Sequence, residues 1–280
     1  MSCGLFGAFC TNRVCRKCRS CKACILRQRP DARDKPFDHR YAHKFPQSFT
    51  VRHLPPALDQ RNISACAVNA CAAAVSACMA RHGFPEFRAS RMFMYYNTRR
   101  HVMKLNSMNV DSGCALRDVC KALSKFGACE ERLWPYSKSL LATEPPVNLY
   151  RTAHRLTRCA YFAVEQSVPS IVACLLSNGA VLMGMSVFNN MFSVRSDGVL
   201  RMPKPSDKRV GSHAVLVCGY DMQARHFLVQ NCWGTDWGKG GYFQVPMDFV
   251  TNPSYCWDFW TLRLTTSMQK ESPACAPSAT

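Results

Sequence analysis

The stretch that decides the fold runs from Gly211 to Phe243 and reads GSHAVLVCGYDMQARHFLVQNCWGTDWGKGGYF. It contains two apolar runs, His213 to Gly219 and Phe227 to Asn231, joined by a short polar connection. Runs of this length bounded by Gly, Asp and Asn are typical of β-strands, and the short connection predicts an antiparallel pair. Pairing would bring His213 near Asn231. An amide at that place can accept the ring N–H of the histidine and fix its tautomer.

A cysteine at the start of a predicted helix completes this set. The segment from Cys66 to Met79 is rich in Ala and contains no Gly or Pro, which predicts a buried helix. Asn62 and Ser64 precede it, and we expect one of them to cap it. The positive end of a helix lowers the pKa of a thiol, so Cys66 is the candidate nucleophile. Gln60, six residues earlier, is a candidate donor to an oxyanion.

The remaining pattern predicts an α+β protein with two unlike halves. A second helix is expected from Ala115 to Phe126, where apolar residues recur at spacings of three and four, and Gly127 would end it. The later part of the chain changes to short apolar runs, which predict strands. These further strands are expected at Ala160–Val164, Val181–Val187 and Gly241–Val245. A cleft between a helical half and a strand-rich half is a natural active site.

Several motifs resemble one known family. The run from Gly211 to Val245 closely resembles the His and Asn region of papain-like cysteine peptidases. The segment from Pro55 to Ala70 resembles the nucleophile region of their divergent bacterial and large-DNA-virus branch, in which the usual tryptophan after the cysteine is absent. The likeness covers about Pro30 to Leu264. Its shorter motifs are Pro30–Asp34, Phe93–Asn97, Asp111–Cys114, Leu133–Tyr136 and Asp258–Trp260.

The resemblance implies a papain-like two-lobed fold, with a helical lobe followed by a β-barrel-like lobe, and a cysteine endopeptidase that needs no cofactor. It assigns Cys66 as nucleophile, His213 as general acid and base, Asn231 as the residue that orients His213, and Gln60 as an oxyanion donor beside the backbone N–H of Cys66. The thiol and the imidazole would form a thiolate and imidazolium pair. Gly113 would let the substrate backbone approach, and Trp233 would cover the His213–Asn231 hydrogen bond from water.

Three positions depart from the family pattern. Arg61 and Ser64 stand where the family usually has glycines, and both would narrow the cleft. Ile63 replaces the half-cystine usually found three residues before the nucleophile, so one familiar disulfide is missing. Arg61 and Ser64 in place of glycines motivate an alternative function, a catalytically weak homologue that binds peptide or protein without cleaving it.

Composition divides the chain into four parts. We expect a flexible Cys-rich basic segment over 1–29, a connector or short pro-like segment over 30–53, a peptidase domain over 54–265 and a disordered tail over 266–280. Within the domain, 54–136 is expected to be mainly helical and 137–265 mainly β.

The first thirty residues carry seven of the Lys and Arg residues that give the chain its net charge of +18, and no acid. Cys15, Cys18, Cys21 and Cys24 recur there at every third position. Such a segment is compatible with a disordered basic tail, with S-acylation and attachment to an anionic membrane, or with metal binding by the cysteines. Its charge would also attract nucleic acid.

The chain contains 18 cysteines, yet it is long enough to fold without disulfides. We expect most of them to be thiols in a reducing compartment. We interpret Cys114, Cys218, Cys232 and Cys256, which lie near the motifs, as packing residues. The short apolar stretch Leu5–Phe9 has no basic residue before it, so we expect a protein that is not classically secreted but intracellular, in a virion or an infected host cell if it is viral.

Overall fold

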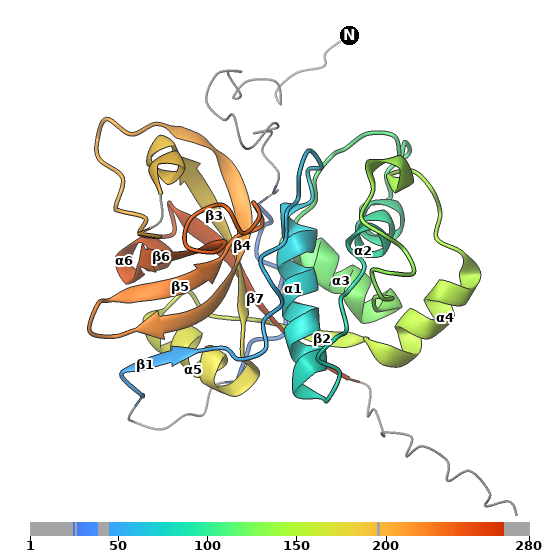
Figure 1. The fold of residues 1–280 in the computed structure, drawn as a ribbon, viewed down its shortest axis with the longest axis horizontal. Coiled ribbons are helices and arrows are strands. Elements are labelled where there is room, and N and C mark those ends of the chain that lie inside the picture. The colour runs from blue at the N-terminus through green and yellow to red at the C-terminus, as the bar shows by residue number, and fades with distance from the viewer. Residues whose placement is uncertain (1–24, 26, 39–44, 195–196, 266–280) are drawn as a thin grey trace, which may run out of the picture.

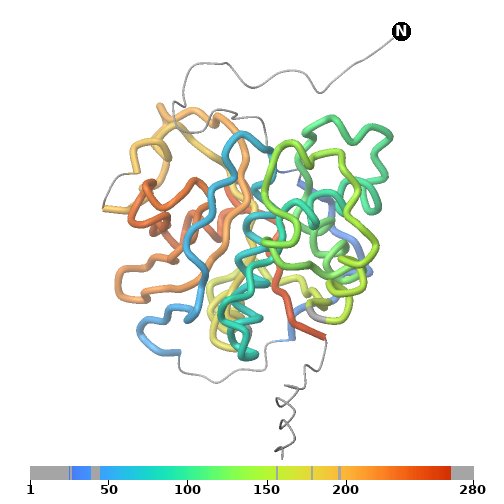
Figure 2. The backbone as a smooth tube through the Cα atoms, turned by 45° about the vertical axis from the view of Figure 1, so that its right-hand side comes forward, coloured from blue at the N-terminus to red at the C-terminus, as the bar shows by residue number. Residues whose placement is uncertain are grey.

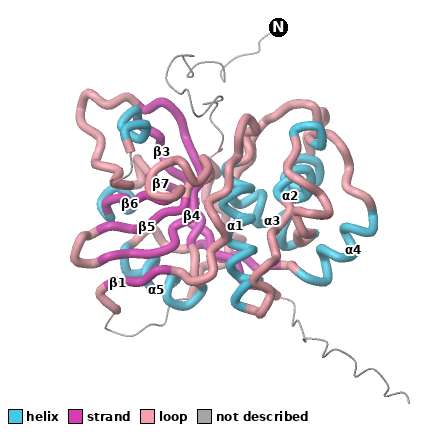
Figure 3. Tube along the Cα trace, viewed as in Figure 1, coloured by secondary structure: helices cyan, strands magenta, loops and turns pink. Residues whose placement is uncertain are grey.

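Helices and strands separate into two halves that lie side by side (Figure 1). The computed structural model describes residues 25, 27–38, 45–194 and 197–265. Helices α1 to α4 lie on one side and most of the sheet on the other. Figure 3 shows the same division by secondary structure. The boundary between the halves is where chain segments far apart in sequence meet.

The strand-rich half is built on one antiparallel sheet with the order β2-β7-β3-β4-β5-β6, and β1 pairs with β4 beyond this path. Its strands are β1 (Ser48–Thr50), β2 (Cys159–Ala163), β3 (Val181–Phe188), β4 (Arg209–Asp221), β5 (His226–Gln230), β6 (Tyr242–Pro246) and β7 (Cys256–Leu264). Two helices belong with it: α5 (Val168–Asn178) and α6 (Met247–Thr251). Strands β3 and β4 are apolar on both faces because the central part of the sheet is buried on both sides.

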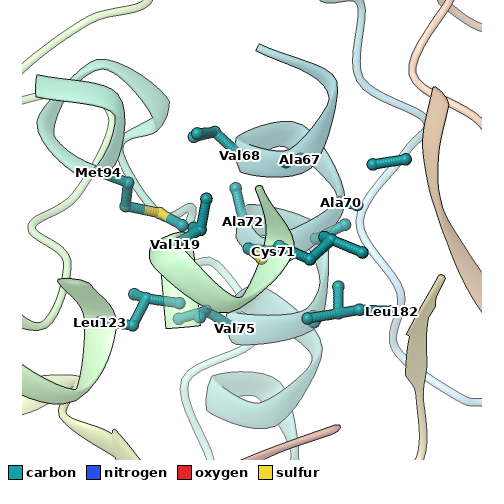
Figure 4. Close-up of a cluster of buried hydrophobic side chains, with 14 of the residues drawn as sticks. Ala67, Val68, Ala70, Cys71, Ala72, Val75, Met94, Val119, Leu123 and Leu182 are labelled. Carbon is teal, nitrogen blue, oxygen red and sulfur yellow. The ribbon is translucent and has the colours of Figure 1, made fainter. Parts of the chain in front are cut away.

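The helical half contains α1 (Cys66–Arg81), α2 (Arg91–Asn97), α3 (Leu116–Phe126) and α4 (Val147–Leu156), with a π-helical turn at Thr98–Val102. Helix α1 packs against both α3 and β4, so it is buried on nearly every face. Small side chains such as Ala72 permit this close packing. Figure 4 shows Val119 and Leu123 on one side of the helix and Leu182 of β3 on the other.

The predicted elements agree with the structure in type and position. The two expected helices are α1 and α3, and Gly127 ends α3 with φ 69°, a conformation that favours glycine. The expected strands correspond to β2, β3, β4, β5 and β6. The α+β fold is therefore as predicted, although the sheet of the second half is open rather than a closed barrel.

Two boundaries differ from those expected. Strand β1 lies before residue 54 but hydrogen-bonds β4, so the packed body includes part of the expected connector. Helix α4 lies after residue 136 but packs against α3, and its residues Leu149 and Ala153 are buried in a cluster with Phe93 of α2. The helical half thus extends about twenty residues further along the chain.

The cysteines in the described ranges are thiols rather than disulfides. Among the same residues, no helix is long and apolar enough to cross a membrane. Within them, no group of three or more His, Cys, Asp or Glu side chains could hold a metal ion. The Cys15–Cys24 cluster and the 266–280 tail lie outside the described residues, so the predictions about them stay predictions.

Candidate active site

The β4–β5 hairpin brings His213 and Asn231 together. The two strands pair antiparallel, with Leu216 opposite Gln230, so Asn231 follows β5 directly beside β4. The Nε2 atom of His213 lies 2.8 Å from Oδ1 of Asn231. Because a carbonyl oxygen only accepts, Nε2 carries the proton and Nδ1 is the basic nitrogen. The backbone N–H of Asn231 donates to the carbonyl of Gly241 at 2.9 Å, which fixes the backbone that carries the Asn231 side chain.

Aromatic rings cover this hydrogen bond. The Trp233 indole lies 4.9 Å from the His213 ring, centroid to centroid. Phe192 stacks on Trp233 at 6.1 Å, and Trp237 meets it edge-on at 5.2 Å. The rings exclude water from one side of His213, which strengthens its hydrogen bond to Asn231.

Cys66 is the first residue of α1, and its side chain is fully buried. It shares a buried cluster with Ala214, the neighbour of His213, and α1 packs against β4. The thiol therefore lies at the positive end of a helix on the boundary with the strand that carries His213. Neither Asn62 nor Ser64 caps this helix. Its N-cap residue is Ala65, which makes no side-chain capping bond, so the expectation of a polar cap was wrong.

Gln60 is buried beside these residues. Its Nε2 donates to the carbonyl of Ile63 at 3.0 Å, and its backbone N–H donates to the carbonyl of Cys232 at 2.9 Å. The Cys232 thiol donates to Gln60 Oε1 at 3.2 Å. These bonds fix the amide plane and direct its N–H groups toward the segment that leads into Cys66.

Cys232 is a site residue that the sequence interpretation missed. Its sulfur lies 3.8 Å from His213 Nε2 as well as next to Gln60, so it joins the imidazole to the oxyanion donor. Its spacing from the other cysteines suggests neither metal binding nor a second nucleophile, so it was interpreted as a packing residue. Its position directly after Asn231 was the available signal.

Burial sets the protonation of His213. His213 is 2% exposed, and this burial lowers the pKa of His213 to about 4, although the hydrogen bond that its ring donates to Asn231 raises the pKa in part. The resting imidazole is therefore neutral at pH 7. This differs from the expected imidazolium, because a dry environment disfavours an added charge.

Part of the chain before β1 also helps to bury the candidate active site. The described residues 25 and 27–38 lie along the boundary between the halves (Figures 1 and 2). Ile25 is 3% exposed and belongs to the same buried cluster as Cys66. Its carbonyl accepts a hydrogen bond from the Ser212 hydroxyl at 3.1 Å, one residue before His213.

Polar contacts hold the next residues of this segment. The Arg27 guanidinium lies 5.6 Å from the Trp257 ring centroid. The Gln28 N–H donates to the Asp258 carboxylate at 3.3 Å, and Arg117 donates to the carbonyl of Arg29 at 2.8 Å. Residues 25 and 27–29 therefore contact β4, β7 and α3. They were expected to be flexible, yet those that the structure describes are packed.

The two positions where glycine is usual are accommodated locally. Arg61 has φ 51°, the left-handed conformation that glycine adopts easily, and its N–H donates to the Asp59 side chain at 2.7 Å. Ser64 is buried, and its backbone N–H donates to both oxygens of Asp111. Gly113 has φ 71°, and its N–H donates to the Tyr95 hydroxyl at 3.0 Å.

Comparison with known proteins identifies the family of this chain. The family model described as papain family cysteine protease matches residues 46–254. The chain belongs to the papain family of cysteine proteases. It is therefore a cysteine peptidase, a hydrolase whose substrates are polypeptides.

Two relatives of this papain-family chain fit the branch suggested by its motifs. An uncharacterized peptidase C1-like protein of Acanthamoeba polyphaga mimivirus is 31% identical over 247 residues, covering 84% of this chain and 76% of the relative. Xylellain, a cysteine protease from Xylella fastidiosa, is 30% identical with a TM-score of 0.79, covering 86% of this chain and 95% of that one. The procathepsin B of Trypanosoma congolense is 16% identical with a TM-score of 0.65 and shares the fold.

Proposed function

We propose that this chain is a cysteine endopeptidase in which Cys66 is the nucleophile and His213 the general acid and base. Asn231 orients His213, and Gln60 together with the backbone N–H of Cys66 stabilises the oxyanion. The observation that carries the proposal is the 2.8 Å contact between His213 Nε2 and Asn231 Oδ1, which leaves Nδ1 as the basic nitrogen. Cys66 supports it by its place at the start of α1, within the same buried region.

The reaction begins with proton transfer from the Cys66 thiol to Nδ1 of His213. The thiolate attacks the peptide carbonyl, and the oxyanion that forms is held by the donors at Gln60 and Cys66. The C–N bond then breaks as the imidazolium protonates the leaving amine. His213 next removes a proton from water, which attacks the thioester and releases the acid with the thiol restored.

Because Cys66 is buried, substrate binding has to displace side chains around it. A peptide at the boundary would take the place of Ile25 and bring its carbonyl to the sulfur. The thiolate formed at Cys66 would then stabilise the imidazolium by its charge, which offsets the effect of burial on the pKa of His213.

The test is hydrolysis of a mixed fluorogenic peptide library under reducing conditions. The native chain is compared with Cys66→Ala and with Cys71→Ala, a matched control for a buried thiol on the same helix. We expect activity to be lost only in Cys66→Ala. A folded native protein that shows no turnover, and whose variant lacking residues 1–29 shows none either, would instead favour the homologue that binds without cleaving.

A further inference from the structure

The first turn of α1 lacks groups that usually stabilise a helix start. Its N-cap is Ala65, no side chain caps it, and no acidic residue lies in the first turn. The Ser64 hydroxyl is buried and, among the described residues, has no hydrogen-bond partner. The positive potential of a helix start favours a negatively charged group nearby.

Asp111 supplies that group from a loop 47 residues away. The backbone N–H of Ser64 donates to its two carboxylate oxygens at 3.1 and 2.9 Å. The Tyr95 hydroxyl donates to the same carboxylate at 2.7 Å and accepts from the N–H of Gly113 at 3.0 Å. A single carboxylate therefore connects the segment before Cys66 with the loop around Gly113.

The Arg99 side chain holds the loop that contains Asp111 and Gly113 in place. Its side chain is fully buried in the π-helical turn, and it donates to the carbonyls of Met108 at 3.0 Å, Val110 at 2.7 Å and Leu141. Its guanidinium lies 4.3 Å from the Tyr95 ring centroid. The positive charge of Arg99 offsets the negative charge of the Asp111 carboxylate, so these side chains together are close to neutral.

We propose that Asp111 is a positioning residue that fixes the Cys66 thiol relative to the Gly113 loop. Ser64 is two residues before Cys66, so a rigid Ser64 backbone limits where the sulfur points. The link joins the nucleophile segment to a distant loop one residue after Ile63, which stands in place of the half-cystine of related chains. The proposal rests on the proposed function, in which Cys66 is the nucleophile and Gly113 lies beside the substrate.

The test compares Asp111→Ala and Asp111→Asn with Asp221→Ala in the full-length protein. Asp221 is a matched control because its carboxylate also accepts a backbone N–H, from Ala224 at 2.9 Å, at the far end of β4. The rate at which iodoacetamide alkylates Cys66 is measured against pH, with mass spectrometry to assign the modified cysteine. The values of kcat and KM are measured in parallel.

We expect Asp111→Ala to lower the plateau rate of alkylation and kcat by about tenfold or more, since small displacements of a reacting group are costly. Asp111→Asn keeps one acceptor and should stay within about threefold of the native plateau, because one hydrogen bond of the pair survives. Asp111→Asn also removes a negative charge that disfavours the Cys66 thiolate. The pH at which alkylation of this variant falls off on the acid side should therefore move down by about one unit. Asp221→Ala should change neither the plateau nor the limb.

If Asp111→Ala does not fold, Tyr95→Phe provides a second test. Tyr95→Phe removes the acceptor of the Gly113 N–H and should raise KM more than it lowers kcat. The proposal is overturned if the alkylation profiles of both Asp111 variants match that of Asp221→Ala, or if Tyr95→Phe leaves KM unchanged in an active enzyme. An alkylated but inactive native protein would refute the proposed function alone, because the alkylation rates would still test Asp111.

Discussion

Shortening the side chain of Ile25 is expected to open the active site. Its side chain is 3% exposed in the buried cluster that also contains Cys66, and Ile25→Ala removes three carbon atoms from that cluster. At about 0.8 kcal/mol for each buried methylene, the loss is about 2.4 kcal/mol. One factor of ten corresponds to about 1.4 kcal/mol, so the open fraction should rise up to about 50-fold. Because only the open form reacts, kcat/KM should rise by the same factor until opening no longer limits it.

The assay is the second-order rate at which a thiol-directed peptide electrophile labels Cys66, with peptide hydrolysis alongside. The chain lacking residues 1–29 should react at least as fast as Ile25→Ala, since it also loses the contacts of Arg27, Gln28 and Arg29. Deletion of residues 1–53 is a poorer test because it would also remove β1 from the sheet.

Val147→Ala provides the matched control, because this aliphatic side chain is 74% exposed on α4. It should label at the native rate. If Ile25→Ala and the shortened chain label no faster than Val147→Ala, the Ile25 contact does not limit access to Cys66. The covering of the site would then have to come from elsewhere, and the reasoning from burial would be refuted.

Three further outcomes are expected. Gln60→Ala should lower kcat by about 10²- to 10³-fold, the usual loss for one oxyanion donor, with KM little changed in steady-state assays. Asp258→Asn should raise the free energy of unfolding by about 1 to 2 kcal/mol at pH 8 but not at pH 4 in urea titrations. Burial raises the pKa of Asp258 to about 6 in the folded chain, so folding favours the protonated side chain. The stability that the native Asp258 contributes in this form is fully present below the unfolded pKa of 3.8 and is lost as the pH rises through 6. Gly241→Ala should lower the melting temperature by several degrees in calorimetry, because Gly241 has φ 88° and an added Cβ would collide with Ala57; an unchanged temperature would contradict it.

The local parts of the site were predictable from the sequence. The partners His213 and Asn231 sit on one hairpin, and a short connection between two apolar runs determines that they meet. The start of α1 at Cys66 follows from an Ala-rich segment without Gly or Pro. These predictions depend only on neighbours in sequence, which is why periodicity and turn residues were sufficient.

The parts that depend on distant contacts were not predictable in this way. Strand β7 is buried at the boundary of the halves, and its sequence CWDFWTLRL lacks the alternation that marks a half-exposed strand. The bond from Ser64 to Asp111 joins two loops, neither of which has a regular pattern. Ile25 lies in a segment whose charge and cysteines resemble a flexible tail, and only its contacts in the folded chain show otherwise.

The departures from the family pattern are better explained as local substitutions than as signs of lost catalysis. Arg61 keeps a backbone conformation that glycine would adopt, and the Asp59 side chain stabilises it through the Arg61 N–H. Ser64 is anchored by Asp111 through its backbone N–H, and its hydroxyl has no hydrogen-bond partner among the described residues that would pull Cys66 away from the start of α1. A binding protein that had lost catalysis would have no need to keep the His213 ring fixed by Asn231 and shielded by aromatic rings. This arrangement favours the peptidase over the non-cleaving homologue. We therefore expect displacement of Ile25, rather than any change in the catalytic residues, to control activity.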